Sequence, residues 1–246
     1  MGDYRAWRGP RTGATLWRLR TGPDDVRVLP DAVMDLMWFN GRFRFAGADT
    51  TAMLSPGEDG AVTWGLRLAP GVAYSLLGIP AWEMTDRRLE LEELTTIPPR
   101  IRESAYLNPA AALENLYVEL WRRAEPDPAV LGLAASLDRF ARAGLGVPDL
   151  AYRHEMSERT LRRLGDRVFG YGPKTLTTIH RFQHALHLAR SGTSLAQAST
   201  AAGYADQSHL NRDVRRLAGT TPGDLLGRGR PIPSRRSAPR MTPSTA

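Results

Sequence analysis

Two short helical pairs joined by one long helix occupy the carboxy-terminal part of the chain, and this pattern constrains the fold more than any other. In the sharper pair, residues 193–202 read as a helix, Gly203 as the turn and residues 206–215 as a second helix. Thr193 and Asp206 carry side-chain oxygens that can accept hydrogen bonds from the free amides of a first helical turn. Glycine tolerates the left-handed backbone of a tight stop. The pattern predicts a helix-turn-helix unit.

The second helix of this pair has one apolar and one polar face. Leu210, Val214 and Leu217 follow the i, i+4, i+7 spacing and are expected to face the partner helix. The opposite face carries side chains of the kind that contact base edges and phosphates in a major groove. These are Gln207, Ser208, Asn211, Arg212 and Arg215. Arg212 has the geometry to hold a guanine by two parallel hydrogen bonds, so sequence-specific DNA binding is the leading hypothesis.

The first pair runs from Pro148, which suits a first helical turn, to a helix that begins after Ser157. Its inward positions are expected to be Leu161, Leu164 and Val168. Its outward face is rich in arginine, which attracts a polyanion. The arginines are Arg159, Arg162, Arg163 and Arg167. The alternative is an ordinary solvated charged face, and the second unit nearby makes this alternative less favoured.

Between the pairs, residues 173–190 hold apolar side chains at helical spacing and end at Ser191-Gly192. At about 1.5 Å per residue this helix is roughly 27 Å long. Successive major-groove faces on one side of B-DNA are about 34 Å apart. One rigid helix of this length therefore predicts that a single chain can present both units to adjacent grooves of one duplex.

These elements resemble the DNA-binding domain of AraC/XylS-type bacterial transcription regulators, over roughly residues 129 to 227. The motifs that carry the resemblance are Ser157-x-x-x-Leu161-x-Arg163, Gly170-Tyr-Gly-Pro173, Gly203-Tyr-Ala-Asp-Gln-Ser-His-Leu-x-Arg212 and Gly219-Thr-Thr-Pro222. The resemblance implies a bipartite domain whose two recognition helices contact bases. It places Arg159, Arg162 and Arg163 of the first helix, and Gln207, Ser208, Asn211 and Arg212 of the second, at contacting positions.

Three positions depart from the pattern of this family. Glu155 stands at the usual turn glycine of the first unit, Gly165 replaces a bulky aromatic, and Ala198-Ser199 stand where Ile-Ala is commoner. Phe169 is expected to refill the space that Gly165 leaves. These departures leave two roles open for the first unit, base reading or contact with the DNA backbone.

Charge is unevenly distributed along the 246 residues. Residues 1–144 contain 17 basic and 19 acidic side chains, a net charge of −2. The whole chain has a net charge of +7, so residues 145–246 have a net charge of +9. This asymmetry favours a nucleic-acid partner for the second half only. The Pro-, Ser- and Arg-rich segment 228–246 is expected to be a disordered basic tail, either attracting phosphate or simply solubilising.

Several classes of protein are disfavoured. No apolar stretch approaches the length of a membrane span, and no signal segment follows Met1, so we expect a cytoplasmic protein. The chain contains no cysteine, and residues 1–144 contain no histidine, which argues against a metalloenzyme, a resident cofactor or any catalytic site there. His180, His184 and His187 share one helical face, but without a carboxylate on that face exposed or interdomain roles are preferred to a metal site.

The amino-terminal half changes from helical periodicity toward alternation. Residues 33–39 and 42–46 flank Asn40-Gly41, which suits a tight hairpin because both positions tolerate positive φ. Further strands are expected at residues 15–20, 26–29 and 61–68, and short helical turns at residues 70–77 and 80–84. The sum predicts a cupin-like small β-barrel or sandwich with short helices.

This half resembles an uncharacterised amino-terminal module of actinobacterial regulators, which implies an effector-binding or dimerising role. The motifs are Leu29-Pro-Asp31, Met34-Asp35-Leu36, Gly47-Ala-Asp-Thr50, Gly65-Leu-Arg-Leu-x-Pro-Gly71 and Leu77-Gly-Ile-Pro80. The candidate effector-binding aromatics are Trp38, Trp64, Tyr74 and Trp82, with ordinary core packing as the favoured alternative. Asp31, Asp35 and Asp49 could form an acid-base site, but surface and turn roles are preferred.

Residues 109–123 form an amphipathic helix whose apolar side either packs on its own barrel or serves as a dimer surface. The expected organisation is a β-rich domain at 1–105, a connecting helix and linker at 106–128, the helix-turn-helix domain at 129–227 and the tail at 228–246. The expected partners are double-stranded promoter DNA and RNA polymerase, with a small-molecule effector and a homodimer as open alternatives. The rival function is an architectural protein that binds DNA without sequence preference.

Overall fold

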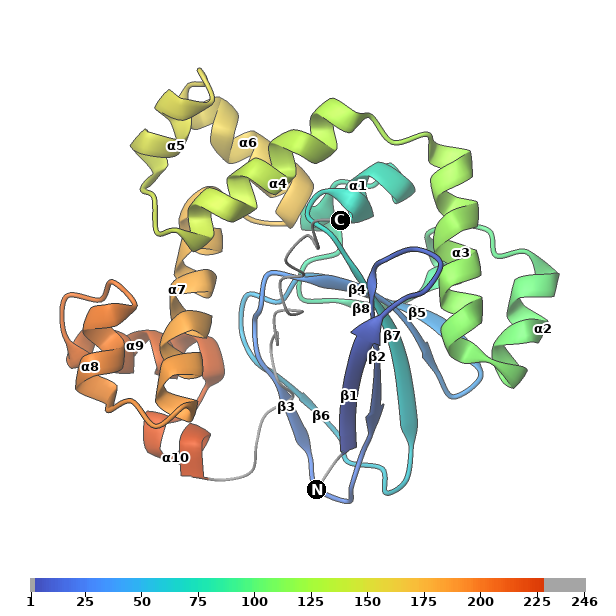
Figure 1. Ribbon diagram of the computed structural model, residues 1–246, viewed down its shortest axis with the longest axis horizontal. Coiled ribbons are helices and arrows are strands. Elements are labelled where there is room, and N and C mark those ends of the chain that lie inside the picture. The colour runs from blue at the N-terminus through green and yellow to red at the C-terminus, as the bar shows by residue number, and fades with distance from the viewer. Residues whose placement is uncertain (1–2, 228–246) are drawn as a thin grey trace, which may run out of the picture.

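The computed structural model describes residues 3–227, which form a β-rich amino-terminal part and a helical carboxy-terminal part (Figure 1). The predictions for the segment 228–246 lie outside the described residues. The eight strands are β1 (Asp3–Arg8), β2 (Thr15–Arg20), β3 (Val26–Val28), β4 (Met34–Phe39), β5 (Arg42–Ala46), β6 (Met53–Ser55), β7 (Val62–Leu68) and β8 (Arg88–Glu90). Among residues 3–227, no helix is both long enough and apolar enough to cross a membrane.

Six strands form one antiparallel sheet in the order β1-β2-β7-β4-β5-β8, and β3 pairs with β6 in a separate sheet of two strands. The hairpin predicted at Asn40-Gly41 is confirmed, because both residues have positive φ, 47° and 74°, and join β4 to β5. The predicted strands β2, β3 and β7 are also confirmed, with bounds that differ by no more than one residue. The expected fold class, a small β structure followed by an all-helical domain, is confirmed.

Register gives the two faces of the large sheet different chemistry. One cross-strand row is entirely apolar and buried, and it consists of Leu16, Leu66, Leu36, Phe45 and Leu89. The neighbouring row on the other face is mostly charged, and it consists of Arg67, Asp35, Ala46 and Arg88. Side chains alternate between the faces of a strand, so the apolar row packs against helices and the charged row faces the opposite side.

Helices cover the apolar face. They are α1 (Val72–Leu77), the single 3₁₀ turns η1 (Ala81–Glu83) and η2 (Leu91–Glu93), α2 (Pro99–Leu107) and α3 (Pro109–Ala124). Leu113, Leu116 and Leu120 of α3 are buried and contact the sheet, which confirms packing as the main role of this helix. Tyr117 and Trp121 stack on one another at its edge, and Trp121 remains 37% exposed.

The carboxy-terminal part contains seven helices within the described range. They are α4 (Pro128–Arg142), α5 (Val147–Arg153), α6 (Glu158–Phe169), α7 (Pro173–Arg190), α8 (Leu195–Ala201), α9 (Gln207–Ala218) and α10 (Pro222–Gly227). Helix α7 forms an axis, with α5 and α6 at one end and α8 and α9 at the other (Figure 1). The two helical pairs and the long connecting helix are therefore confirmed.

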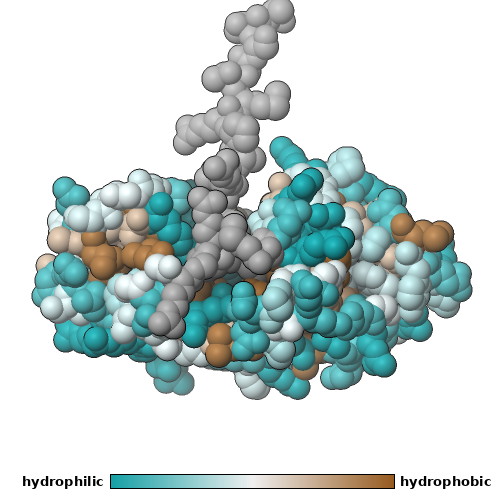
Figure 2. All heavy atoms as spheres, turned by 90° about the horizontal axis from the view of Figure 1, so that it is seen from below, coloured by the Kyte–Doolittle hydropathy of each residue, from teal (hydrophilic) through white to brown (hydrophobic). Residues whose placement is uncertain are grey.

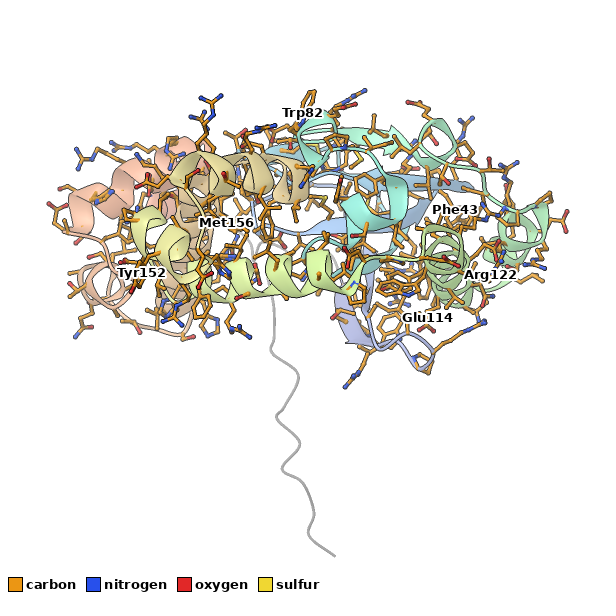
Figure 3. The ribbon with its side chains drawn as sticks, turned by 90° about the horizontal axis from the view of Figure 1, so that it is seen from above. Phe43, Trp82, Glu114, Arg122, Tyr152 and Met156 are labelled. Carbon is orange, nitrogen blue, oxygen red and sulfur yellow. The ribbon has the colours of Figure 1, made fainter. Side chains whose placement is uncertain are left out.

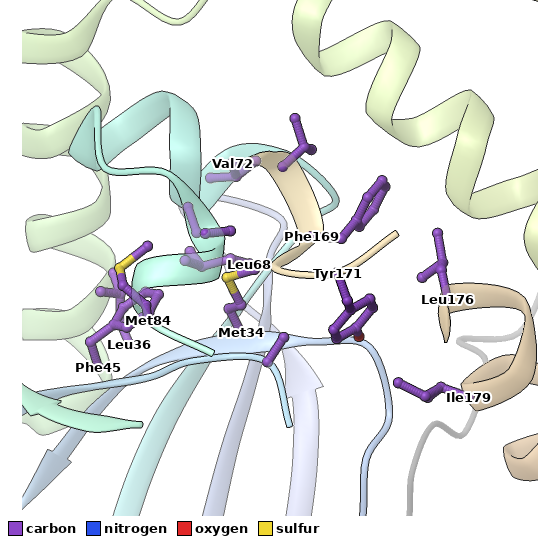
Figure 4. Packing of buried hydrophobic residues seen from close by; sticks show 14 of the residues in the cluster. Met34, Leu36, Phe45, Leu68, Val72, Met84, Phe169, Tyr171, Leu176 and Ile179 are labelled. Carbon is purple, nitrogen blue, oxygen red and sulfur yellow. The ribbon is translucent and has the colours of Figure 1, made fainter. Parts of the chain in front are cut away.

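One hydrophobic core runs through both parts of the molecule. Met34 and Leu68 of the sheet, Phe169 at the end of α6 and Tyr171 in the following turn lie along one continuous path (Figure 4). Phe169 was expected to fill the space beside Gly165, but that position is closed differently. A Cβ on Gly165 would lie 3.0 Å from the Tyr171 carbonyl oxygen and 3.1 Å from the Pro173 ring. The turn after α6 occupies that space.

Candidate nucleic-acid interface and ligand cavity

Side-chain caps fix where each recognition helix begins. The Ser157 side chain accepts from the Thr160 amide at 3.1 Å at the start of α6, and the Asp206 side chain accepts from the His209 amide at 2.6 Å at the start of α9. Both caps were predicted. Thr193 was the wrong residue for the start of α8, because Ser194 holds the cap position and accepts from the Gln197 amide. Thr193 and Ser194 both carry a hydroxyl that can cap a helix, so the sequence alone does not show which of the two occupies the cap position.

The turns of the two units are built differently. Gly203 has a φ of 81°, as expected for the turn between α8 and α9. Glu155 occupies the corresponding turn between α5 and α6 with a φ of 52°, so it adopts the left-handed conformation without being glycine. A residue other than glycine is strained there, and the surrounding helices must hold the turn in place.

The predicted DNA-contacting side chains lie on α6 and α9, and one of them, Arg163, also lines the groove between the two parts of the molecule. Seven of the eight are exposed, and Asn211 is half-buried; the exposed ones are Arg159, Arg162, Arg163, Gln207, Ser208, Arg212 and Arg215. Within residues 3–227, the guanidinium groups of the five arginines of this set make no hydrogen bond or ion pair. Arg167 is different, because its guanidinium lies 5.4 Å from the Tyr74 ring centroid. The unpaired guanidinium groups on both recognition helices are free to bind phosphate or bases.

Two buried aspartates hold the inner side of this domain. Asp213 of α9 pairs with Arg181 of α7 at 3.2 Å and with Arg216 at 2.8 Å. Asp138 of α4 accepts from His180 of α7 at 2.8 Å and from Arg142. These pairs link α9 and α4 to the long helix α7.

From the sequence, an exposed or interdomain role was preferred for His180. That prediction is wrong, because His180 is buried within the helical part. The carboxylate that the sequence analysis did not find comes from α4 rather than from the histidine's own helix. Burial alone would raise the pKa of Asp138, but hydrogen bonds from His180 and Arg142 lower it to about 2. His184 and His187 are exposed, and no group of metal-ligating side chains occurs among residues 3–227.

A cavity of about 220 Å³ lies on the charged face of the large sheet, between it and the strand pair β3-β6. Asp31, Asp35 and Asp49 line it, together with Arg67 and Arg88. Surface and turn roles were preferred for these aspartates. Asp31 does accept from the Val33 amide in a turn at 3.2 Å, and all three aspartates also form ion pairs inside the cavity. The sequence shows the alternation of the strands but not which of their two faces encloses a hollow.

The four candidate effector-binding aromatics do not meet in this cavity. Trp38 is buried on the opposite face against Phe43 and Tyr106, and Trp64 packs edge to face on Trp7. Tyr74 lies under Arg167, and Trp82 is 57% exposed at the outer edge of the molecule (Figure 3). For Trp38 the favoured alternative, core packing, is what the structure shows. The aromatic rings that do line the cavity are Tyr4, Trp17 and Phe39.

A shallower groove of about 730 Å³ lies between the two parts of the molecule. Trp82 and Pro80 form one wall, and Leu133 of α4 with Met156 and Arg163 form the other. The face of the molecule in Figure 2 is mainly hydrophilic, with small separate hydrophobic patches. No single apolar patch dominates that face.

Direct contacts join the amino-terminal part to the second recognition helix. The Arg27 guanidinium of β3 donates to the Ala218 carbonyl at 2.8 Å, and the Ala52 amide donates to the Leu217 carbonyl at 2.7 Å. The side chain of Gln183, on α7, lines the cavity and donates to the Pro30 carbonyl. The cavity, the strand pair β3-β6 and the end of α9 are thus in contact with one another.

Comparisons with known proteins agree with this architecture. Residues 150–228 match the family described as a helix-turn-helix domain, and residues 14–90 match a domain of unknown function, DUF6597. No curated protein matches the chain.

Solved structures of similar shape come from two bacteria. A probable AraC family transcriptional regulator from Rhodopseudomonas palustris is 25% identical, with a TM-score of 0.36, over 41% of this chain and 99% of that one. ToxT from Vibrio cholerae is 9% identical, with a TM-score of 0.44, over 92% and 97% of the two chains. ToxT with a bound unsaturated fatty acid is 8% identical, with a TM-score of 0.43, over 92% and 94%.

The family match covers both helical pairs, and the described arginines are exposed on α6 and α9. The second family match covers strands β2 to β8, and with them most of the cavity wall. The chain therefore joins a DUF6597 domain to a helix-turn-helix domain.

Proposed function

We propose that α6 and α9 are the recognition helices of a sequence-specific regulator and that each enters a major groove of the same duplex. The observation that carries this proposal is the set of unpaired, exposed arginines on both helices. Arg212 and Arg215 extend from α9 without a partner in the described chain, whereas Arg216 of the same helix is bound to Asp213. Unpaired guanidinium groups keep their hydrogen-bonding capacity for guanine edges and phosphates.

The length of α7 suits this arrangement. Its 18 residues make it roughly 27 Å long at about 1.5 Å per residue. Adjacent major-groove faces are about 34 Å apart, which is close to this length. The ion pair between Asp213 and Arg181 ties α9 of the second unit to α7, and α6 of the first unit packs against the same helix.

Selection of random duplexes by the purified full chain, at about 150 mM salt, tests the proposal, because exposed charge attraction is already well screened there. We expect a motif of two blocks separated by one helical turn of DNA. Recovery of no motif while binding persists would support an architectural protein that contacts only the backbone. The salt dependence of affinity is the second readout, since a purely backbone-bound protein has a steep slope for every sequence.

The cavity beside β3-β6 supports a regulatory role for the amino-terminal part. We propose that a small molecule occupies the cavity and shifts the population between two placements of the helical part. Arg27 and Ala52 connect the cavity wall to the end of α9, and Gln183 of α7 forms part of the wall. A ligand that prefers one placement changes DNA affinity only by the ratio of its affinities for the two. A binding role fits better than catalysis, because every aspartate of the cavity is engaged in an ion pair.

We propose two protein partners, a second copy of the chain and RNA polymerase. The stacked pair Tyr117 and Trp121 lies at the exposed edge of α3 and is the candidate dimer contact. Trp121→Ala should reduce the mass measured by sedimentation equilibrium from dimer to monomer, and an unchanged dimer would exclude this surface. Transcription in vitro from a selected site, with and without the chain, tests the effect on polymerase.

A further inference from the structure

The charges that line the cavity do not cancel. The lining contains four carboxylates and three guanidinium groups, namely Asp31, Asp35, Asp49, Glu58, Arg44, Arg67 and Arg88. Arg44 is engaged by Glu90 at 3.1 Å, and Glu90 lies outside the lining. Arg88 binds Asp49 through two hydrogen bonds of 2.9 and 2.7 Å, so this pair is complete.

The remaining guanidinium is shared between two carboxylates. Arg67 lies 3.4 Å from Asp31 and 3.7 Å from Asp35, and both distances are longer than that of the complete pair with Arg88. Burial raises the pKa of Asp31 above its ordinary value, and the charge of Arg67 offsets only part of this rise. One negative charge at this end of the cavity therefore has no full counter-charge among the described residues.

Aromatic rings lie next to this charge. Trp17 stacks on Tyr4 with ring centroids 6.2 Å apart, and its indole nitrogen donates to Asp35 at 2.9 Å. The ring lies flat across β7 because residue 65 is glycine, where a Cβ would be 2.0 Å from the indole. The faces of tryptophan and tyrosine attract cations, and a carboxylate beside them adds a direct counter-charge.

The rest of the cavity is mainly apolar, with Val26, Val28 and Met53 on the strand pair and Met37 and Phe39 on β4. Its volume of about 220 Å³ exceeds that of an engineered cavity of ~150 Å³ that binds benzene. An anionic ligand would have to compete with Asp31, Asp35 and Asp49 for the arginines that they already bind. A neutral ligand would leave the extra carboxylate without a counter-charge.

We propose that the cavity binds a small primary amine, with its ammonium group between Asp31, Asp35 and the rings of Trp17 and Tyr4 and its apolar body against β3-β6. The assignment rests on the proposed role of the cavity as an effector site. It names the chemical class of the effector, a singly charged cation with an apolar body of about the size of a benzene ring.

Three probes of equal size and different charge test this assignment. Benzylamine, benzyl alcohol and benzoate are titrated separately into the full chain at neutral pH, and binding is measured by calorimetry. We expect benzylamine to bind at least tenfold more tightly than either of the other two. Equal or tighter binding of the alcohol or of benzoate overturns the amine assignment, and so does the absence of benzylamine binding.

Two substitutions locate the binding. Asp35→Asn removes the extra charge while Asp31 still pairs with Arg67, and it should weaken benzylamine binding at least tenfold. Glu103→Gln is the matched control, because Glu103 is exposed on α2 and lies outside the lining, and it should leave binding unchanged. Equal binding by wild type and Asp35→Asn places the amine elsewhere and overturns the proposal. Thermal unfolding of each variant shows whether the fold is retained.

The failure of this assignment can be distinguished from the failure of the proposed regulator. The affinity for a selected duplex is measured with and without saturating benzylamine. Binding of benzylamine with no change in DNA affinity would keep the amine class and reject effector control. A change in DNA affinity caused only by benzoate or the alcohol would keep effector control and reject the amine class.

Discussion

At the scale of single residues, ion pairing separates the arginines that we propose contact DNA from those that stabilise the fold. Arg212 and Arg216 are both exposed and lie four residues apart on α9, but only Arg216 forms an ion pair, with Asp213. The sequence places both on the surface of one helix. Only the position of Asp213, buried between α9 and Arg181 of α7, shows which of the two is engaged.

Arg212→Ala is expected to cost about 1 to 3 kcal/mol of binding free energy on the selected site and to reduce discrimination at one base pair. The physical reason is the loss of two parallel hydrogen bonds to a guanine edge. Fluorescence anisotropy with duplexes altered at single positions measures both effects. Arg20→Ala, which removes an exposed arginine without an ion pair in the described chain from β2, is the control for a general loss of charge. Equal weakening on every duplex would show that Arg212 contacts phosphate only.

The buried aspartate Asp138 leads to a prediction for acid stability. Its pKa falls from an ordinary 3.8 to about 2 in the folded chain, so the ionised form is stabilised by folding. A carboxylate whose pKa is lowered by folding contributes its full stabilisation at any pH above its pKa in the unfolded chain. This stabilisation is lost as the pH falls through its pKa in the folded chain, and for Asp138 it amounts to about 2 kcal/mol. Asp138→Asn should therefore lower Tm near neutral pH, and the difference from wild type should shrink between about pH 4 and pH 2.

Melting curves at a series of pH values, followed by circular dichroism, provide this comparison. Glu103→Gln is again the control, since its exposed carboxylate has no ion pair in the described chain. A Tm difference for Asp138→Asn that stays constant from pH 6 to the acid limit would mean that the variant is destabilised by altered packing rather than by the lost charge.

At the scale of elements, the start of α9 depends on one side chain. Asp206 accepts from the His209 amide and so satisfies one of the free amides of the first turn. Asp206→Ala should lower the free energy of unfolding by about 0.5 to 2 kcal/mol. It should also weaken DNA binding, because Gln207 and Ser208 lie in the turn that loses its cap. Urea denaturation gives the first quantity, with Asp206→Ser as the control that retains a capping oxygen.

Periodicity and capping residues predicted most of these elements. Strands β2, β4, β5 and β7 alternate clearly, and the helical pairs are bounded by residues with known capping roles. Strand β1 escaped prediction because it is an almost wholly exposed edge strand with no buried face to impose alternation. Strands β6 and β8 contain only three residues each, and neither has two apolar residues at alternate positions, unlike the equally short β3, where Val26 and Val28 flank Arg27. Helix α2 begins at the second of two prolines in a mixed sequence.

The candidate DNA-contacting surface could be proposed from the sequence for a physical reason that does not apply to the cavity. A recognition helix carries its whole contact surface on one segment, so helical spacing alone collects Gln207, Asn211 and Arg212 on one face. The cavity is assembled from all eight strands and α7, and its charged row depends on the register of β4, β5, β7 and β8. The four aromatic residues proposed from the sequence to bind an effector therefore do not line the cavity, because the sequence does not show which side chains enclose it.

At the scale of the whole molecule, the amino-terminal part and the helix-turn-helix domain share one core and several direct hydrogen bonds. Thr85 of the first part donates to the Gly170 carbonyl at 3.1 Å, next to the end of α6. Arg27 and Ala52 reach the end of α9, so both recognition helices end against the same amino-terminal part. A change in that part can consequently reach both helices.

Hydrogen exchange followed by mass spectrometry tests this docking. The Ala52 amide donates to the Leu217 carbonyl and should exchange slowly in the intact chain. Arg27→Ala removes the neighbouring bond to Ala218 and should accelerate exchange at Ala52 and in the last turn of α9, while β4 stays protected. Arg20→Ala, an exposed arginine on β2, is the control. Unchanged exchange in Arg27→Ala would mean that this contact does not hold the two parts together.

The two bonds at the end of α9 also bear on how such proteins can be recombined. A helix leaves its last carbonyl groups without partners in its own backbone, and here Leu217 and Ala218 receive theirs from residues of β3 and the loop before β6. The last carbonyl groups of α9 thus receive their hydrogen bonds from a distant segment of the same chain. A graft that gives this carboxy-terminal domain to another amino-terminal module has to supply donors at the same two oxygens, or the final turn of its recognition helix is left to water.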